Sequence, residues 1–285
     1  MEAAALLRSP TATSLSLRCS TPSTTRSSTT PSPASPSPHP LSAVRSPPPH
    51  APSPWPPDPQ RPRPSDPLPK GADAFFRTVI SNMEKVYLSR NPTAKAVLDL
   101  VQSHDGNNVC YDHFAFRTFG VDGYGINSLA GFFMDFGYTP REELRFPAKK
   151  LKALWFSPPA SYYIQSGTGV DGPLPRIFIS ELLVEEMSSQ CQEVIRKYIK
   201  TSGSGHKHAV LASTSGCLTW EKPIYSDYQI LSRESEYAAW TLVNGYALNH
   251  VTISTHRLKS HIRSIKSLNQ FIEDSGFKLN SEGES

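Results

Sequence analysis

Hydrophobic residues recur at two spacings along residues 71–285, and each spacing predicts one kind of element. A helical spacing begins near Ala74, is interrupted at Asn91-Pro92 and resumes to about residue 104. An alternating spacing in "YDHFAFRTFG" (111–120) predicts a strand. The same two patterns predict further strands at 138–145, 151–156, 176–183 and 247–254, and further helices at 127–136, 184–200, 232–245 and 258–275.

The strand at 111–118 has two chemically different faces. Successive strand residues point to opposite sides of a sheet, so Phe114 and Phe116 share a face that we expect to pack against helices. The opposite face carries a histidine and an arginine, which a purely structural strand does not need. That face is predicted to hold Tyr111, His113, Ala115 and Arg117.

Two parts of the chain resemble each other. "DHFAF" is followed by "SLAGFFMDFGY", and "NHVTI" is followed by "SLNQFIEDSGF". His113 precedes Gly137 by 24 residues, and His250 precedes Gly276 by 26. A repeated order of strand, helix, glycine and strand indicates a duplicated module.

The first copy continues into three more extended runs, which makes a β-α-β-β-β module at about 107–183. Paired modules of this kind resemble the vicinal-oxygen-chelate superfamily. The predicted fold is therefore α+β, with paired βαβββ modules preceded by N-terminal helices. The second module, about 246–285, looks truncated.

In such a pair, His113 and His250 would face one cleft from equivalent positions, while Val251 and Ile253 would face the helices. Two converging imidazoles are typical of a transition-metal site, although a single strand histidine is more often an ordinary core or surface residue. Arg117 has no counterpart in the second copy. Because an unpaired buried arginine is costly, we expect it to meet an anion such as a substrate carboxylate.

The first 70 residues differ from the rest in composition. They hold 19 of the 27 prolines, with seven basic and three acidic residues. Too few apolar side chains are present to offset the entropy of ordering, so disorder is predicted. A start rich in Ser, Thr and Arg is typical of a plastid or mitochondrial transit peptide, followed by a Pro-rich spacer. A Pro-rich linker or a ligand for Pro-recognition domains is the alternative.

The remaining 215 residues carry 22 basic and 22 acidic groups, so the net positive charge belongs to the leader and does not indicate nucleic-acid binding. No apolar run is long enough to span a bilayer, which argues against a membrane partner. Four scattered cysteines contain no CxxC pair, which disfavours a zinc finger or a disulfide framework.

Three motifs, "YDHFAFRTFG", "RIFISELL" and "LNHVTIS", resemble the 2-oxoadipate dioxygenase/decarboxylase family over about residues 71–280. The resemblance implies Fe(II) held by two histidines and one glutamate, and conversion of 2-oxoadipate and O2 to 2-hydroxyglutarate and CO2 in plastid lysine catabolism. By position, His113 and His250 would be metal and substrate ligands, and Arg117 would bind a carboxylate of the 2-oxo dicarboxylic acid.

The third ligand of that set is not evident. In this fold the carboxylate comes from the last strand of the second module, which we expect beyond Ser285. Glu181, on the last strand of the first module, is a weak substitute, and we expect it instead to pair with a lysine or arginine or to face solvent. Two other functions therefore stay open: a non-catalytic plastid scaffold that influences starch metabolism, and a glyoxalase-like metal isomerase or lyase.

Overall fold

The computed structural model describes residues 14–17, 68–106, 108–162, 166–258 and 261–279. Most of the predicted leader lies outside the described residues. Its segment Ser14–Leu17 forms strand β1, which pairs antiparallel with the strand of the second module. The disorder predicted for the leader as a whole stays a prediction.

The chain's first helices are those that the hydrophobic spacing predicts. Helix α2 spans Lys70–Arg90 and α3 spans Pro92–His104. Asn91 leaves the helical conformation, and Pro92 begins α3 at a position where its missing N–H is not needed. The break predicted at Asn91-Pro92 is confirmed.

The first module follows the predicted order, and the α+β class is confirmed. Strand β2 continues into α4, and three more strands complete the module, with short 3-10 turns η1 (Pro147–Lys149) and η2 (Ala160–Tyr162) after β3 and β4. The sheet has the order β1-β6-β2-β5-β4-β3, in which only β2 and β5 run parallel. The elements are β2 (Tyr111–Phe119), α4 (Asn127–Asp135), β3 (Thr139–Phe146), β4 (Leu151–Ser157) and β5 (Arg176–Leu182).

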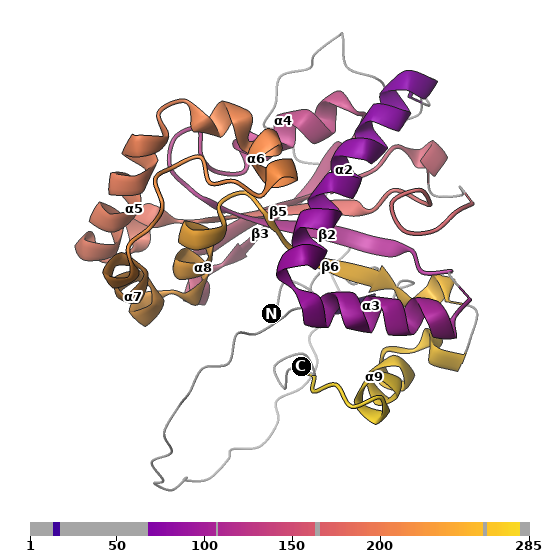
Figure 1. Ribbon diagram of the computed structural model, residues 1–285. Helices are drawn as coiled ribbons and strands as arrows, with labels where there is room; N and C mark the ends of the chain where they lie inside the picture. Colours follow the sequence, from indigo (N-terminus) through magenta and orange to yellow (C-terminus); the bar gives the residue numbers. More distant parts are fainter. Residues whose placement is uncertain (1–13, 18–67, 107, 163–165, 259–260, 280–285) are drawn as a thin grey trace, which may run out of the picture. The chain divides into compact units, whose positions relative to one another are not determined.

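The segment between the modules is helical. The helix predicted at 232–245 is two helices, α7 and α8, because Ser235 is extended and its hydroxyl caps α8 by accepting from Ala238 N–H. Figure 1 shows this segment, drawn in orange, gathered at one end of the sheet. Its elements are η3 (Val184–Glu186), α5 (Ser189–Ser202), η4 (Gly205–His208), α6 (Ala209–Ser215), α7 (Tyr225–Glu234) and α8 (Glu236–Asn244).

The described part of the second module comprises β6 (Leu248–Ser254), the turns η5 (Thr255–Arg257) and η6 (His261–Arg263), and α9 (Ile265–Asp274). The helix predicted at 258–275 is wrong over its first turns. Ser264 starts α9 by accepting a hydrogen bond from Ser267 N–H, so the basic stretch before it lies outside the helix. Described residues after α9 form no strand as far as Leu279.

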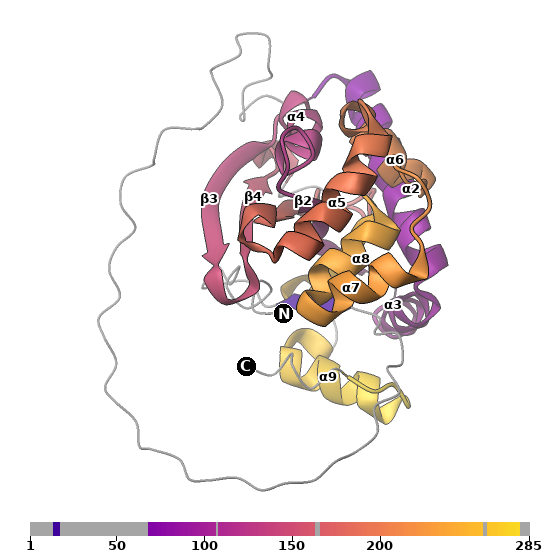
Figure 2. The same cartoon turned by 90° about the vertical axis from the view of Figure 1, so that its left-hand side faces the viewer.

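One face of the sheet packs against helices, as predicted. Figure 1 shows α2 crossing this face, and Figure 2 shows β3 and β4 curving at the far edge of the sheet. Phe114, Phe116, Val251 and Ile253 are each no more than 1 % exposed. Aromatic rings join the layers: Phe116 contacts Phe133 of α4 at 5.8 Å between ring centroids.

Glu181 lies on the helix-facing side of β5, because it pairs in register with Thr118 rather than with a residue of the histidine face. Its carboxylate accepts from the Ile126 N–H at the start of α4 (2.8 Å) and pairs with Lys152 Nζ (2.8 Å). The expected lysine partner is therefore confirmed. Glu181 also acts as the cap of α4. Neither Asn127 nor Ser128 provides a side-chain cap hydrogen bond.

We expect Glu181→Ala to lower the free energy of unfolding by about 1–3 kcal/mol, because it leaves the Ile126 N–H and Lys152 without their partner. Urea denaturation followed by circular dichroism measures this. The control Glu185→Ala removes an exposed ion pair with Arg196, which is worth at most about 1 kcal/mol. Equal, small effects of the two variants would contradict a capping role for Glu181.

Candidate functional site

The two histidines singled out by the repeat lie side by side on neighbouring strands. His113 is on β2 and His250 is on β6, and both are almost fully buried. Their Nε2 atoms are 3.4 Å apart, and their rings are nearly perpendicular with centroids 5.4 Å apart. The pairing of β2 with β6 thus joins side chains that are 137 residues apart in sequence.

A bulge in β2 orients the first imidazole. Between Tyr111 and His113 the register shifts against β6, so that Asp112 has no partner of its own. The Asp112 carboxylate turns toward its neighbour and accepts a hydrogen bond from His113 Nδ1 at 2.9 Å. Bulges often re-aim side chains at functional sites.

A second bulge, in β6, orients the other imidazole in the same way. Ala115 pairs with His250 and Phe116 pairs with Leu248, which leaves Asn249 as the extra residue. The Asn249 side-chain oxygen lies 2.9 Å from His250 Nδ1 and accepts a hydrogen bond from it. Each histidine therefore has its Nδ1 proton held by the residue that precedes it.

This arrangement leaves Nε2 of each ring without a proton, and the two Nε2 atoms face each other at 3.4 Å. An Nδ1–H tautomer carries its free lone pair on Nε2, which is the atom that binds a metal. Thr252 Oγ1, buried and 3.0 Å away, donates to His113 Nε2. Two ring nitrogens bound to one ion at about 2.1 Å, with an angle between about 90° and 110°, are about 3.0–3.4 Å apart. The observed separation fits two ligands of one transition-metal ion.

Asp112 is held as an anion beside His113. Burial raises the pKa of the Asp112 carboxyl, but the hydrogen bond from His113, together with Arg176, outweighs it and lowers that pKa below its ordinary value. Arg176 Nη2 also donates to the other carboxylate oxygen of Asp112. The carboxylate is thus fixed at both oxygens.

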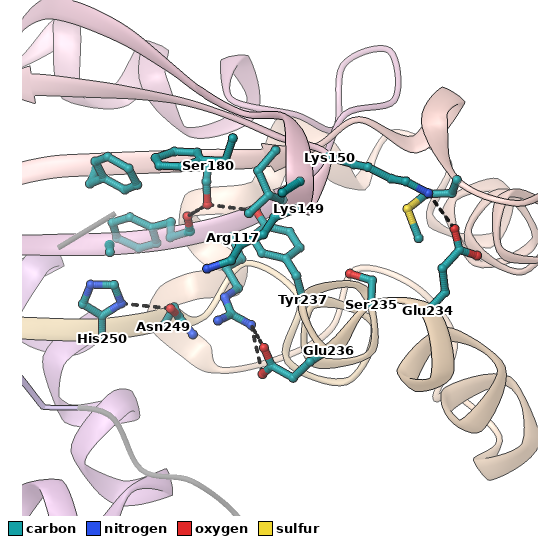
Figure 3. Close-up of a pocket in the computed structure, with 17 residues that line it drawn as sticks. Arg117, Lys149, Lys150, Ser180, Glu234, Ser235, Glu236, Tyr237, Asn249 and His250 are labelled. Atoms are coloured by element: carbon teal, nitrogen blue, oxygen red, sulfur yellow. Dashed lines mark hydrogen bonds and ion pairs between the residues drawn. The ribbon is translucent and has the colours of Figure 1, made fainter. Parts of the chain in front are cut away.

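A cavity of about 350 Å³ opens next to His250, on the face of the sheet away from α2 and α4. Figure 3 shows His250 and Arg117 on adjacent strands facing this cavity, with the start of α8 opposite them. Its walls combine apolar side chains with a few charged groups, an arrangement typical of small-molecule sites. The walls include Ala115, Phe146 and Phe178 on the apolar side and Lys149, Lys150, Glu234 and Glu236 on the charged side.

Arg117 is buried in the wall of the cavity, and the anion that it meets in the structure is the Glu236 carboxylate; its role toward a substrate carboxylate stays a prediction. Its Nη1 lies 3.3 Å from Glu236 Oε1, and its guanidinium stacks on Tyr237 and Trp240 with 4.9 and 5.2 Å to the ring centroids. Burial raises the pKa of Tyr237 to about 12, so this ring stays a neutral phenol beside the cation. The alternation on β2 places Arg117 on the same face as His113.

Sequence reasoning missed the residues that orient the site. Asp112, Asn249, Glu236 and Tyr237 gave no pattern of their own, although an Asp or Asn before each histidine was visible in the repeat. Alternation also misplaced Tyr111. Because of the bulge at Asp112, Tyr111 turns toward the helices, where it contacts Phe114 and donates to Glu84 of α2.

Within the described residues no group of three His, Cys, Asp or Glu side chains converges, so the structure supplies two imidazoles and not a complete ligand set. Glu181 is excluded as the third ligand, since it lies on the opposite face of the sheet and is engaged by Ile126 and Lys152. None of the helices in the part of the chain that the structure describes has the length and apolar character that crossing a bilayer requires.

Two curated relatives are strongly similar to this chain. One, from Oryza sativa subsp. japonica, is named 2-oxoadipate dioxygenase/decarboxylase, chloroplastic/amyloplastic, and is 79 % identical over 216 residues. The other, from Arabidopsis thaliana, is named 2-oxoadipate dioxygenase/decarboxylase, chloroplastic, and is 66 % identical over 212 residues. The alignments cover 76 % and 74 % of this chain, and the chain spans 59 % and 57 % of the relatives' lengths.

Two solved structures share the fold. The hydroxyglutarate synthase of Oryza sativa, crystallised with 2-oxoadipate, is 76 % identical with a TM-score of 0.75, over 82 % of this chain and 73 % of that one. A protein described as a putative hydrolase from Shewanella frigidimarina is 33 % identical with a TM-score of 0.61, over 72 % and 75 % of the two chains. Residues 79–285 match the family described as 2-oxoadipate dioxygenase/decarboxylase, and the chain therefore belongs to that family.

Proposed function

We propose that this chain carries the metal and substrate site of a plastid 2-oxoadipate dioxygenase/decarboxylase. The reaction is the conversion of 2-oxoadipate and O2 to 2-hydroxyglutarate and CO2, in lysine catabolism. The atoms of these two reactants equal those of the two products, so no further reductant is required. The observation that carries the proposal is the pair of Nε2 atoms 3.4 Å apart, each on an imidazole whose Nδ1 proton is already bound.

Dioxygenase chemistry calls for a metal cofactor, and we propose Fe(II), with His113 and His250 as ligands. Imidazole nitrogen suits iron, and Fe(II) sites with two histidines and one carboxylate keep open positions for other ligands. Bound Fe(II) would supply those open positions for a 2-oxo acid and O2. The third, carboxylate ligand stays a prediction.

We assign Arg117 to the substrate's distal carboxylate. Arg117 lies four positions after His113, so their Cα atoms are roughly 13 Å apart at the usual rise of a strand. A long side chain reaching back into the cavity leaves room for an extended six-carbon acid between the two ends. The guanidinium fork matches a carboxylate, and the apolar wall around Ala115 and Phe178 suits the methylene chain between them.

The names of the two relatives place them in the chloroplast or amyloplast, in agreement with the plastid location predicted from the leader. A 2-oxo dicarboxylic acid and O2 are the partners that the proposal requires. An O2 electrode separates this function from its alternatives, because a glyoxalase-like enzyme would act without O2 and an inert scaffold would consume none.

We expect a protein of full family length that contains this chain, supplied with Fe(II), to consume O2 only when 2-oxoadipate is present. His113→Ala and His250→Ala should each abolish this O2 uptake. Each should also weaken the binding of Co(II), measured by visible absorption, by more than the 10- to 100-fold that is typical when a residue hydrogen-bonded to a metal ligand is lost. His208→Ala, on the exposed turn η4, serves as the control and should change neither. Turnover that survives in either histidine variant would refute the assignment.

The two orienting residues give a second prediction. Asp112→Asn should weaken Co(II) binding by about tenfold, because a neutral acceptor makes His113 a poorer donor, and Asn249→Asp should strengthen it. Arg176→Gln removes the ion partner of Asp112 but leaves the Asp112 carboxylate as the acceptor of the His113 Nδ1–H hydrogen bond. This variant should therefore bind Co(II) as the native chain does. Unchanged metal affinity in both Asp112→Asn and Asn249→Asp would show that these hydrogen bonds do not tune the site.

A further inference from the structure

Arg117 and Glu236 form an ion pair in which the two partners have very different surroundings. The Arg117 side chain is 9 % exposed, whereas the Glu236 side chain is 79 % exposed. Arg117 Nη1 lies 3.3 and 3.4 Å from the two carboxylate oxygens, which are long distances for a charge-assisted hydrogen bond. A mostly hydrated carboxylate is thus held loosely against a buried cation.

The position of the guanidinium does not depend on Glu236. Tyr237 and Trp240 of α8 stack on it, with ring centroids 4.9 and 5.2 Å from its central carbon. Tyr237 is itself fixed, because its hydroxyl lies 2.9 Å from Ser180 Oγ and accepts from the Thr118 N–H. The anion-binding group is therefore preorganised, and the carboxylate beside it is the replaceable part.

We propose that Glu236 is an internal competitor that occupies the carboxylate position on Arg117 and leaves it when a dicarboxylate ligand binds. The inference rests on the proposed role of Arg117 in binding the distal carboxylate. Figure 3 shows Glu236 at the side of Arg117, with the cavity and His250 close by. Release costs little, because the exposed Glu236 carboxylate passes into water and the guanidinium keeps an anionic partner.

This exchange favours ligands that carry a carboxylate at the correct end. A ligand without that group cannot replace Glu236 on Arg117. It would either leave the ion pair in place or displace Glu236 and leave the buried guanidinium without a partner. Glu236 thereby competes with ligand carboxylates for Arg117, and its removal should strengthen the binding of those ligands alone.

The neighbouring Glu234 provides a matched control. It lines the same cavity, but its carboxylate accepts from Lys150 Nζ at 2.9 Å and from the Ser188 N–H at 3.0 Å. Hydrogen bonds from Cys191, Ser188 and Lys150 lower the pKa of Glu234 to about 2. The Glu234 carboxylate thus has other partners. Among the described residues, the carboxylate that pairs with Arg117 is that of Glu236.

The test is isothermal titration of the metal-free chain with glutarate, a dicarboxylate without a 2-oxo group, and with uncharged glutaramide. Glu236→Gln should bind glutarate about two- to fivefold more tightly than the native chain, the range expected for loss of one exposed ion pair. Glu234→Gln should bind glutarate as the native chain does, and glutaramide should gain no affinity in either variant. Circular dichroism confirms that each variant is folded.

Absence of tighter glutarate binding in Glu236→Gln, including a failure of glutarate to bind at all, overturns the inference. Equal tightening in Glu234→Gln overturns it as well, since any change of charge near the cavity would then suffice. The Arg117→Lys variant tests the proposed function separately. If Arg117→Lys binds glutarate as tightly as the native chain, the carboxylate role assigned to Arg117 is wrong, whatever Glu236 does.

Discussion

The rest of this site depends on two hydrogen bonds, each donated by the Nδ1–H group of one imidazole. Asp112 accepts from His113 and Asn249 accepts from His250, both at 2.9 Å. With these protons held, neither ring carries a proton on Nε2, and the pairing of β2 with β6 brings the two Nε2 atoms to 3.4 Å.

The two faces of the sheet have different roles. The face toward α2 and α4 is filled by Phe114, Phe116 and the aliphatic residues of β6, which hold the strands in register. A register fixed by one face determines what the other face presents, because a one-residue slip would invert every side chain. The bulges at Asp112 and Asn249 are local exceptions that place a polar acceptor next to each histidine.

Much of this arrangement was predictable from the sequence. The repeat placed His113 and His250 at equivalent positions, and alternation placed Phe114 and Phe116 against the helices. Alternation failed where a bulge intervenes, since no local pattern marks Asp112 or Asn249 as extra residues. It also could not show that Glu236, from a helix far along the chain, meets Arg117. Such contacts depend on how the segments pack and not on their spacing.

The extended conformation of Ser235 was also invisible to the helical pattern across 232–245. Apolar spacing continues through that residue, but the hydroxyl gains more by capping α8 than by joining a continuous helix. The consequence reaches the cavity, because the first turn of α8 supplies both Glu236 and Tyr237. A local capping choice thus determines the surroundings of Arg117.

The most direct test of the account is long-range ¹H–¹⁵N NMR of the histidine side chains, recorded before and after addition of one equivalent of Zn(II). The account predicts that His113 and His250 both carry their proton on Nδ1 in the metal-free chain. It also predicts that both Nε2 resonances shift together at the first equivalent of metal. A proton on Nε2 of either ring in the metal-free chain, or a shift confined to one of the two, would contradict it.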